Sequence, residues 1–277
     1  MLKIDAHQHF WYFNPVRDSW INEEMVVIQR DFLPAELQPI LEAHGFDGCV
    51  TVQSDQSEEE NKFQLANAEQ HEFIKGVVGW VNFWGDDVEE RLTELSQFKK
   101  LKGFRYVLQS EVDRAVMLNP KFMQGISKLN QFGYTYDILV YPDQLPYIKE
   151  FVATFPEQRF VIDHLAKPYI KDRNITPWKQ DMEAIAAFEN VSCKISGLVT
   201  EADWKQWKKE DFRPYLDTVV NAFGTNRILY GSDWPVCLVA ATYAETLGIV
   251  QEYFAAFSQH DQALFFGGNA TAFYNLA

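Results

Sequence analysis

The chain has 277 residues, of which 47% are hydrophobic and 15% aromatic, enough apolar material for one large core. Its 25 basic and 39 acidic residues give a formal net charge of −14. So acidic a chain repels phosphate backbones and anionic membrane surfaces, and we expect neither nucleic acid nor a membrane as a partner. No apolar run in the sequence approaches the roughly 20 residues that a membrane span needs.

The N-terminus and the cysteines indicate a compartment. Residues 1–10 carry a polar, histidine-bearing motif with no basic segment and apolar stretch, so we expect no signal peptide. The three cysteines, Cys49, Cys193 and Cys237, each lie in or beside an apolar run and cannot all pair. They are predicted to be buried, reduced thiols, as is typical of a cytoplasmic protein.

Short β-rich runs alternate with longer helical stretches along the chain. Eight strands are predicted, at residues 3–9, 49–53, 75–83, 103–108, 135–141, 160–164, 191–195 and 228–232. Helical periodicity marks residues 35–44, 58–71, 88–98, 121–132, 143–155, 178–188, 212–223 and 243–257. Residues 265–268 predict a last short strand or loop, with a closing helix after Asn269.

Strands that alternate with helices favour a parallel sheet, because each return to the same edge needs a crossover. Eight such units in this length predict an α/β fold of the (β/α)8 TIM-barrel type, with residues 1–277 as a single domain. A doubly wound open sheet is the competing architecture, but no GxGxxG or GxxxxGK[ST] motif follows any strand. The segment 10–33, with Arg17 and Trp20, is long for a βα loop and is expected to contact substrate.

Two histidines mark the end of the first predicted strand. His7 and His9 are two residues apart, so their side chains point the same way and can hold one metal ion or one substrate oxygen. The alternative is a pair of polar strand residues facing solvent. Their place at the carboxyl end of a barrel strand, where active sites lie, favours a functional role.

His164 and Asp233 close the sixth and eighth predicted strands. Taken singly, His164 could be satisfied by backbone groups and Asp233 could be a turn former. Together with His7 and His9 they form a nitrogen and oxygen set suited to Zn²⁺ or another borderline divalent ion. Asp233 could also accept a proton from an attacking water.

Charged side chains follow other strands. Arg105 on the fourth and Lys194 on the seventh add positive charge, which could polarise a carbonyl, although surface charge is their common use. Asp137 lies on the fifth strand and is a candidate substrate contact. Aromatic faces could stack on a ring-shaped polar substrate, with core packing as the alternative; the candidates near strand ends are Trp11, Trp84 and Trp234.

These residues make the chain resemble the amidohydrolase superfamily, in particular its sugar-lactonase group, which also includes 2-pyrone-4,6-dicarboxylate lactonases. The matching segments follow one another along nearly the whole chain: residues 4–11, 102–105, 136–137, 162–168, 193–198, 230–235 and 268–270. The resemblance implies a (β/α)8 barrel and the hydrolysis of a small lactone. It points to an aldonolactone such as L-fucono- or L-rhamnonolactone.

The resemblance also implies residue roles. Asp233 would deprotonate a water, helped by His7, His9 and His164 or by a metal that they hold, while Arg105 and Lys194 polarise the lactone carbonyl. Many metal-dependent relatives carry a carbamoylated lysine on the fourth strand or a metal-binding histidine on the fifth. Here Arg105 and Asp137 stand at those places, so a two-metal site is not expected.

Two questions stay open at this level. The group includes members that act without a metal, so both a Zn²⁺ site at His7, His9, His164 and Asp233 and a metal-free reaction are retained, as is a homodimer. Two other functions also compete with a lactonase. One is a decarboxylase with a single metal ion, and the other is a sugar-binding barrel without activity.

Overall fold

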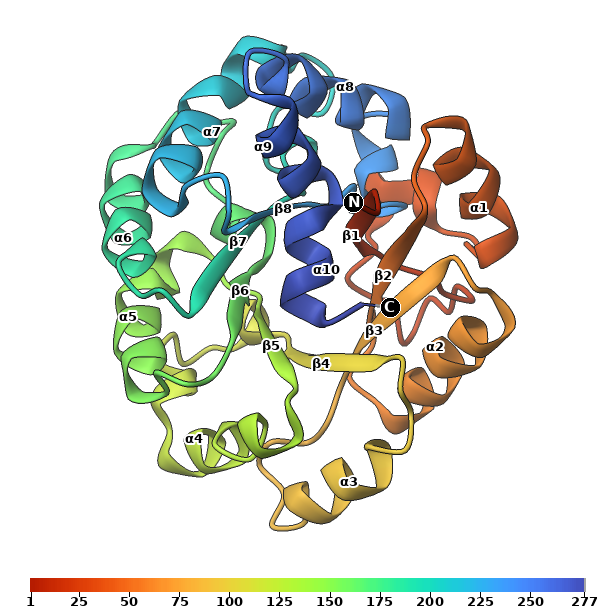
Figure 1. Ribbon diagram of the computed structural model, residues 1–277, viewed down its shortest axis with the longest axis vertical. Helices are drawn as coiled ribbons and strands as arrows, with labels where there is room; N and C mark the ends of the chain where they lie inside the picture. Colours follow the sequence, from red (N-terminus) through yellow and green to blue (C-terminus); the bar gives the residue numbers. More distant parts are fainter. Residues whose placement is uncertain (277) are drawn as a thin grey trace.

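The computed structural model describes residues 1–276, and its eight parallel strands form one sheet in chain order (Figure 1). The strands are β1 (Ile4–Gln8), β2 (Gly48–Val52), β3 (Ile74–Gly79), β4 (Leu101–Tyr106), β5 (Thr135–Ile138), β6 (Phe160–Ile162), β7 (Val191–Ile195) and β8 (Ile228–Tyr230). All eight predicted strands are confirmed, although β3 and β5 end several residues earlier than expected. The sheet curls round so that the segment after β8 meets β1, where Asp233 N–H donates to His7 O at 2.9 Å. The fold is the predicted (β/α)8 barrel.

The helices form a ring around the strands (Figure 1). They are α1 (Pro34–Ala43), α2 (Glu58–Gln70), α3 (Val88–Leu95), α4 (Pro120–Ile126), α5 (Leu145–Thr154), α6 (Thr176–Ala186), α7 (Lys209–Phe223) and α8 (Tyr243–Phe254). Two short helices, α9 (Gln259–Ala263) and α10 (Asn269–Tyr274), follow at the end of the chain. Pro34, Pro120 and Pro177 occupy first helical turns, where a missing N–H costs nothing. No helix within residues 1–276 has the length and apolar character needed to cross a bilayer.

The end of the chain differs from the prediction. Residues 264–268 form a π-helical turn between α9 and α10, not a strand. Gly267, which lies just before α10, packs against the backbone of Leu2. A side chain at Gly267 would lie 2.0 Å from Leu2 O, so this turn is fitted against the start of the chain. The closing helix after Asn269 is confirmed as α10, which lies across the centre of the ring near both termini (Figure 1).

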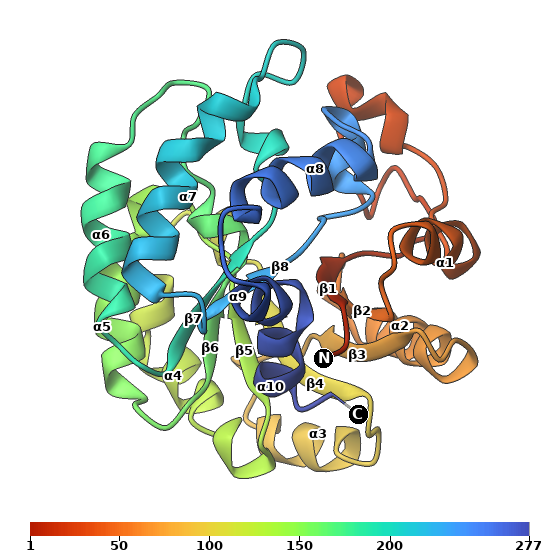
Figure 2. The same ribbon diagram turned by 45° about the horizontal axis from the view of Figure 1, so that its top comes forward.

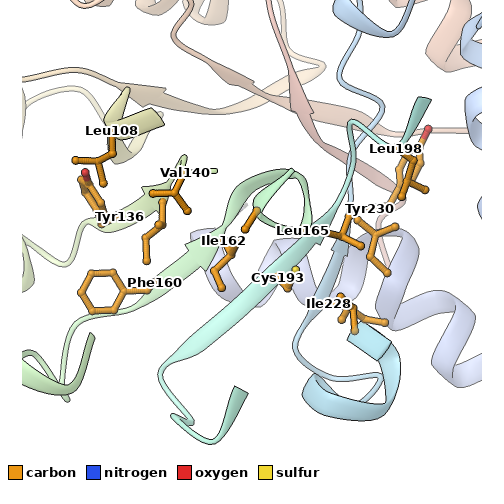
Figure 3. Close-up of a cluster of buried hydrophobic side chains, with 14 of the residues drawn as sticks. Leu108, Tyr136, Val140, Phe160, Ile162, Leu165, Cys193, Leu198, Ile228 and Tyr230 are labelled. Atoms are coloured by element: carbon orange, nitrogen blue, oxygen red, sulfur yellow. The ribbon is translucent and has the colours of Figure 1, made fainter. Parts of the chain in front are cut away.

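Two apolar clusters hold the barrel together. The larger one lies between strands and helices, and Figure 3 shows part of it, with Tyr136, Ile162 and Cys193 among the buried side chains. The smaller one fills the inside of the barrel, where Ile4, Val50 and other strand residues meet side chains of α10. All three cysteines are buried and free, as predicted.

The long segment after β1 is ordered by pairing at its ends. Trp11 and Phe32 exchange two backbone hydrogen bonds of 3.0 and 2.9 Å, and the Trp11 indole N–H donates to Arg30 O. The 3-10 helix η1 (Glu23–Ile28) lies within this segment. Figure 2 shows it on the side of the barrel away from the two chain termini. The segment is therefore an ordered loop that lies over the carboxyl ends of the strands.

Candidate active site

The candidate catalytic side chains come together at the carboxyl ends of the strands. His7 is the last residue but one of β1 and His9 follows the strand. Arg105 lies on β4, His164 follows β6, and Asp233 follows β8. Beside them is a cavity of about 430 Å³, whose wall includes His9, Arg105, His164 and Asp233. A pocket of this size that collects several polar groups is the usual form of a small-molecule site.

The three histidines and Asp233 point at one another. His7 Nε2 lies 3.2 Å from His9 Nε2, and Asp233 Oδ1 lies 3.4 Å from His9 Nε2. The same oxygen is 3.9 Å from both His7 Nε2 and His164 Nε2. The pairing of β1 with β2 shifts register between Asp5 and Gln8, so the alternation assumed from the sequence is not regular there. The side chains of His7 and His9 nevertheless meet, as predicted.

Two of these imidazoles are held in place by a hydrogen bond at Nδ1, the nitrogen that faces away from Asp233. His9 Nδ1 lies 2.7 Å from Val52 O, and His164 Nδ1 lies 2.9 Å from Ser196 Oγ. These contacts leave the Nε2 atoms of both rings facing Asp233. Such a second contact orients a histidine for catalysis or metal binding.

The backbone around His164 is unusual. His164, Leu165, Ala166 and Lys167 all have φ between 51° and 55°, and Asp233 has φ of 58°. Left-handed conformations cost non-glycine residues roughly 1–2 kcal/mol each. Strain of this kind persists where the surrounding structure holds it, and it is concentrated at functional sites. Here it directs His164 and Lys167 toward the cavity.

A buried charge network lies behind the cavity. Arg105 Nη1 donates to Asp163 Oδ2 at 3.1 Å, and Arg105 also donates to Gln53 O. Lys194 Nζ lies 3.0 Å from Asp163 Oδ1 and 2.5 Å from Asp137 Oδ2. The side chains of Lys194, Asp137 and Asp163 are completely buried, so each charge depends on its partners.

The surroundings of His7, His164 and Asp233 shift their pKa values. Burial lowers the pKa of His7 and of His164 well below the ordinary value, which keeps both rings neutral near neutral pH. Burial alone would raise the pKa of Asp233, but nearby His164 and His9 outweigh it and hold that pKa below its usual value. Asp233 is therefore an ionised carboxylate beside the neutral rings of His7 and His164, and in this form it can accept a proton.

The same residues fit a divalent metal ion. His7, His164 and Asp233 each offer one ligand atom, and these atoms lie within 4.8 Å of one another. His9 Nε2 lies beside them. A nitrogen and oxygen set with each outer imidazole nitrogen engaged is of the kind that holds Zn²⁺. The donor chemistry thus agrees with the metal site expected from the sequence.

Several predicted contacts lie away from the cavity. Trp11 and Trp234 are buried in the core, and Trp84 packs against Phe122; none of the three lines the cavity. The tryptophan that lines it is Trp20, whose exposed fraction is 44%. The surroundings of Trp11, Trp84 and Trp234 therefore agree with core packing, the alternative to a substrate contact. Lys194 and Asp137 lie beneath the site and do not reach the cavity.

The sequence reasoning did not select Asp163, although it joins Arg105 to Lys194, or Ser196, which holds His164. Asp163 directly precedes His164 at a strand end, and this position was a usable signal. Ser196 gave none, because a serine after a strand is common. Lys167 and Arg17 also line the cavity.

Histidines and an aspartate at the ends of the first, sixth and eighth strands lie where barrel enzymes place their active sites. The model of the amidohydrolase family matches residues 4–276. The chain belongs to the amidohydrolase family.

Several proteins are similar to this chain in sequence or in structure. The chain is 37% identical to an L-fucono-1,5-lactonase of Burkholderia multivorans over 286 aligned positions, covering 99% of this chain and 96% of the relative. A crystal structure of a Burkholderia multivorans amidohydrolase with bound zinc superposes over 100% of both chains, with a TM-score of 0.96 and 37% identity. An L-rhamnono-gamma-lactonase of Scheffersomyces stipitis is 26% identical over 53% of this chain and 49% of its own length.

Proposed function

We propose that this protein, acting as a single domain, hydrolyses a sugar lactone, an aldonolactone of the L-fucono or L-rhamnono type. The observation that carries the proposal is the full-length likeness to an L-fucono-1,5-lactonase. It is supported by the ionised Asp233 carboxylate on the wall of a cavity of sugar size. Lactones are strained or activated esters, so one base and one electrophile can suffice for their hydrolysis.

In the proposed reaction Asp233 takes a proton from a water in the cavity. The resulting hydroxide attacks the lactone carbonyl carbon, and the carbonyl oxygen becomes an oxyanion beside the Arg105 guanidinium, which stabilises it. The tetrahedral intermediate then collapses, the bond to the ring oxygen breaks, and this oxygen collects the proton from Asp233. The product is the open-chain aldonic acid, which releases a proton at neutral pH.

His9 and His164 orient the carboxylate of Asp233 in this scheme. A divalent ion, for which Zn²⁺ is the best candidate, would be held by His7, His164 and Asp233 with His9 beside them. When bound it would acidify a water and polarise the carbonyl. The residue roles above require no other cofactor.

The charge balance of the cavity favours an uncharged polyol over a dicarboxylate. Each cation on its wall already has a carboxylate partner. Arg17 bonds both oxygens of Asp18 at 2.8 Å, Arg105 bonds Asp163, and Lys167 Nζ lies 3.7 Å from Glu201. A substrate carboxylate would have to displace one of these partners. Hydroxyl groups can instead share the remaining donors and acceptors, and the exposed face of Trp20 suits a sugar ring.

The test follows acid release with a pH indicator, using L-fucono-1,5-lactone, other aldonolactones and 2-pyrone-4,6-dicarboxylate. We expect rapid turnover of an aldonolactone and none of the dicarboxylate. Asp233→Asn removes the base and should lower kcat by about 10²- to 10⁴-fold. Asp143→Asn, at a surface ion pair with Arg114, is the matched control and should not change the rate.

Other outcomes would redirect the assignment. If no lactone is opened but carbon dioxide is released from an aromatic acid, the protein is a decarboxylase. If lactones bind without turnover, and Asp233→Asn binds them equally well, the barrel is a binding protein. Either result overturns the lactonase proposal.

A further inference from the structure

Asp55 is a carboxylate on the cavity wall without a partner in the described part of the chain. It belongs to the loop between β2 and α2, and it lines the cavity that Arg105 and Asp233 also line. Its side chain is half-buried. Whereas Ser54 and Gln56 on either side of it are hydrogen-bonded, Asp55 takes part in no side-chain hydrogen bond or ion pair within residues 1–276.

The loop around Asp55 is held in place by its neighbours. The Ser54 N–H donates to Glu60 Oε1 at 2.9 Å, and Glu60 is itself buried on α2. On the other side, the Val107 N–H donates to Gln56 Oε1 at 2.8 Å, which ties the loop to the segment after β4. Asp55 is thus presented to the cavity by an ordered loop. A carboxylate in this position is preorganised for a ligand, because binding does not have to order the loop.

Other residues already fill the two structural roles that a carboxylate has at this place. The amino end of α2 attracts negative charge, but its first turn holds three glutamates and Ser57 caps it. A nearby cation could pair with Asp55, but Arg17, which lines the same cavity, directs Nε and Nη2 to the two oxygens of Asp18, each at 2.8 Å. The Asp55 carboxylate is therefore available to a ligand in the cavity.

The chemistry of a carboxylate limits what this ligand offers. A carboxylate oxygen only accepts hydrogen bonds, so the group that Asp55 binds must donate. In an aldonolactone the carbonyl oxygen and the ring oxygen only accept, and the hydroxyl groups are the only donors. Arg105 has the opposite chemistry, because a guanidinium only donates. The two residues therefore select opposite parts of the substrate, the hydroxyl groups at Asp55 and the carbonyl oxygen at Arg105.

We propose that Asp55 is a specificity-determining residue, which accepts hydrogen bonds from two neighbouring hydroxyl groups of the lactone. Its two carboxylate oxygens match hydroxyl groups on adjacent ring carbons, and hydrogen bonds to a charged acceptor are stronger than neutral ones. The same negative charge repels a lactone that carries a carboxylate. This inference rests on the proposed lactonase function, and it names the part of the substrate that the protein recognises.

The first test compares an aldonolactone with a series of analogues that each lack one ring hydroxyl. The wild type should lose about 10- to 100-fold in kcat/KM on the analogues that lack a hydroxyl bound by Asp55, the effect of one hydrogen bond to a charged group. Asp55→Ala should lose about as much on the complete lactone, chiefly through a higher KM, and should then hydrolyse both substrates with similar kcat/KM. A general structural defect would lower both values and leave their ratio unchanged.

The second test uses the charge of the carboxylate. Asp55→Asn keeps the shape of the side chain and one acceptor oxygen but removes the charge. The kcat/KM for a lactone that carries a carboxylate, such as a glucarolactone, should therefore rise relative to that for a neutral aldonolactone, by about tenfold or more. Asp86→Asn is the matched control, since Asp86 is an exposed carboxylate that pairs with Lys121 and does not line the cavity. Its preference between the two lactones should equal that of the wild type.

The outcomes separate this inference from the lactonase function. If the wild type opens aldonolactones and Asp55→Ala keeps the full loss on every analogue without a hydroxyl, the role of Asp55 is wrong and the function stands. An unchanged preference between neutral and charged lactones in Asp55→Asn also overturns the role of Asp55. If the wild type opens no lactone, the function is wrong and this inference fails with it.

Discussion

Gly197 lies against the ring of His164, and a Cβ atom on Gly197 would be 2.9 Å from His164 Nδ1. Real Cβ atoms almost never approach another heavy atom so closely. Gly197 also has φ of +63°, a conformation that glycine adopts without steric cost. The absence of a side chain at this position is thus a condition for the orientation of His164.

Gly197→Ala should therefore lose activity beyond the cost of backbone strain. The left-handed backbone predicts a loss of about 1–2 kcal/mol in the free energy of unfolding, and the new methyl group should push His164 away from Asp233 and lower kcat. Gly45→Ala is the matched control, since Gly45 has φ of +69° and no atom within 4 Å of an added Cβ. Urea unfolding and lactonase kinetics on both variants check this. A similar kcat in the two variants would show that the contact with His164 is unimportant.

Ser196 is expected to matter through His164. Its hydroxyl lies 2.9 Å from His164 Nδ1, so Ser196→Ala frees the ring to rotate. Loss of such a contact typically lowers metal affinity by about 10- to 100-fold, and we expect a drop of this order for Zn²⁺ together with a lower kcat. Ser192→Ala changes a serine within β7, four residues earlier and outside the site contacts, and it should leave both unchanged. Titration of both variants with Zn²⁺ measures their affinities, and equal affinities would contradict the role of Ser196.

Arg105 is expected to need its planar guanidinium. It bonds Asp163 and Gln53 O together, whereas a lysine amine is a compact charge that cannot span both in the same geometry. Arg105→Lys should lower kcat about 10²-fold, the usual loss when an oxyanion loses a fixed donor. Arg91→Lys changes a guanidinium that pairs with Glu58 and Glu94 away from the cavity, and its kcat should equal that of the wild type. A small effect in Arg105→Lys would assign the oxyanion to another group.

Glu60 gives a prediction for stability against pH. Burial raises the pKa of Glu60 above its ordinary value of 4.5, so the folded state keeps this proton longer than the unfolded state. Stability therefore falls as pH rises from the unfolded pKa through the folded one. Glu60→Gln lacks this dependence, so its stability relative to wild type should increase between about pH 4 and about pH 7.

The measurement is urea unfolding of wild type and Glu60→Gln at both pH values. Glu59→Gln is the control because the neighbouring Glu59 side chain is 80% exposed. Its stability difference from wild type should stay constant across the same range. If Glu60→Gln behaves like Glu59→Gln, the buried carboxylate does not titrate as inferred.

Much of the fold could be predicted because its signals are local. The alternation of strands and helices fixed a parallel barrel in chain order, and prolines marked several first turns, as at Pro34 and Pro177. The tail was predicted less well. Residues 265–268 were predicted to be a strand or loop because they are apolar and glycine-rich. In the structure Gly267 packs against Leu2, and residues 264–268 form a π-helical turn.

Some residues of the site could also be predicted from the sequence, and others could not. Strand ends gather at one side of a parallel barrel, so His7, His164 and Asp233 could be grouped before any contact was known. The tryptophans could not be placed, since their rings suit both a core and a sugar. Only the structure puts Trp20 on the cavity wall and Trp234 in the core.

The sequence by itself determined the order and direction of the strands and the end of the barrel where polar groups collect. These depend on hydrophobic periodicity and on the rule that parallel strands end together. Only the tertiary structure decided which inward charges meet. Lys194 pairs with Asp137, Asp163 and His7 because the strand register brings residues far apart in the chain to one level inside the barrel. Register is set by packing around the whole ring, and no local stretch of sequence contains it.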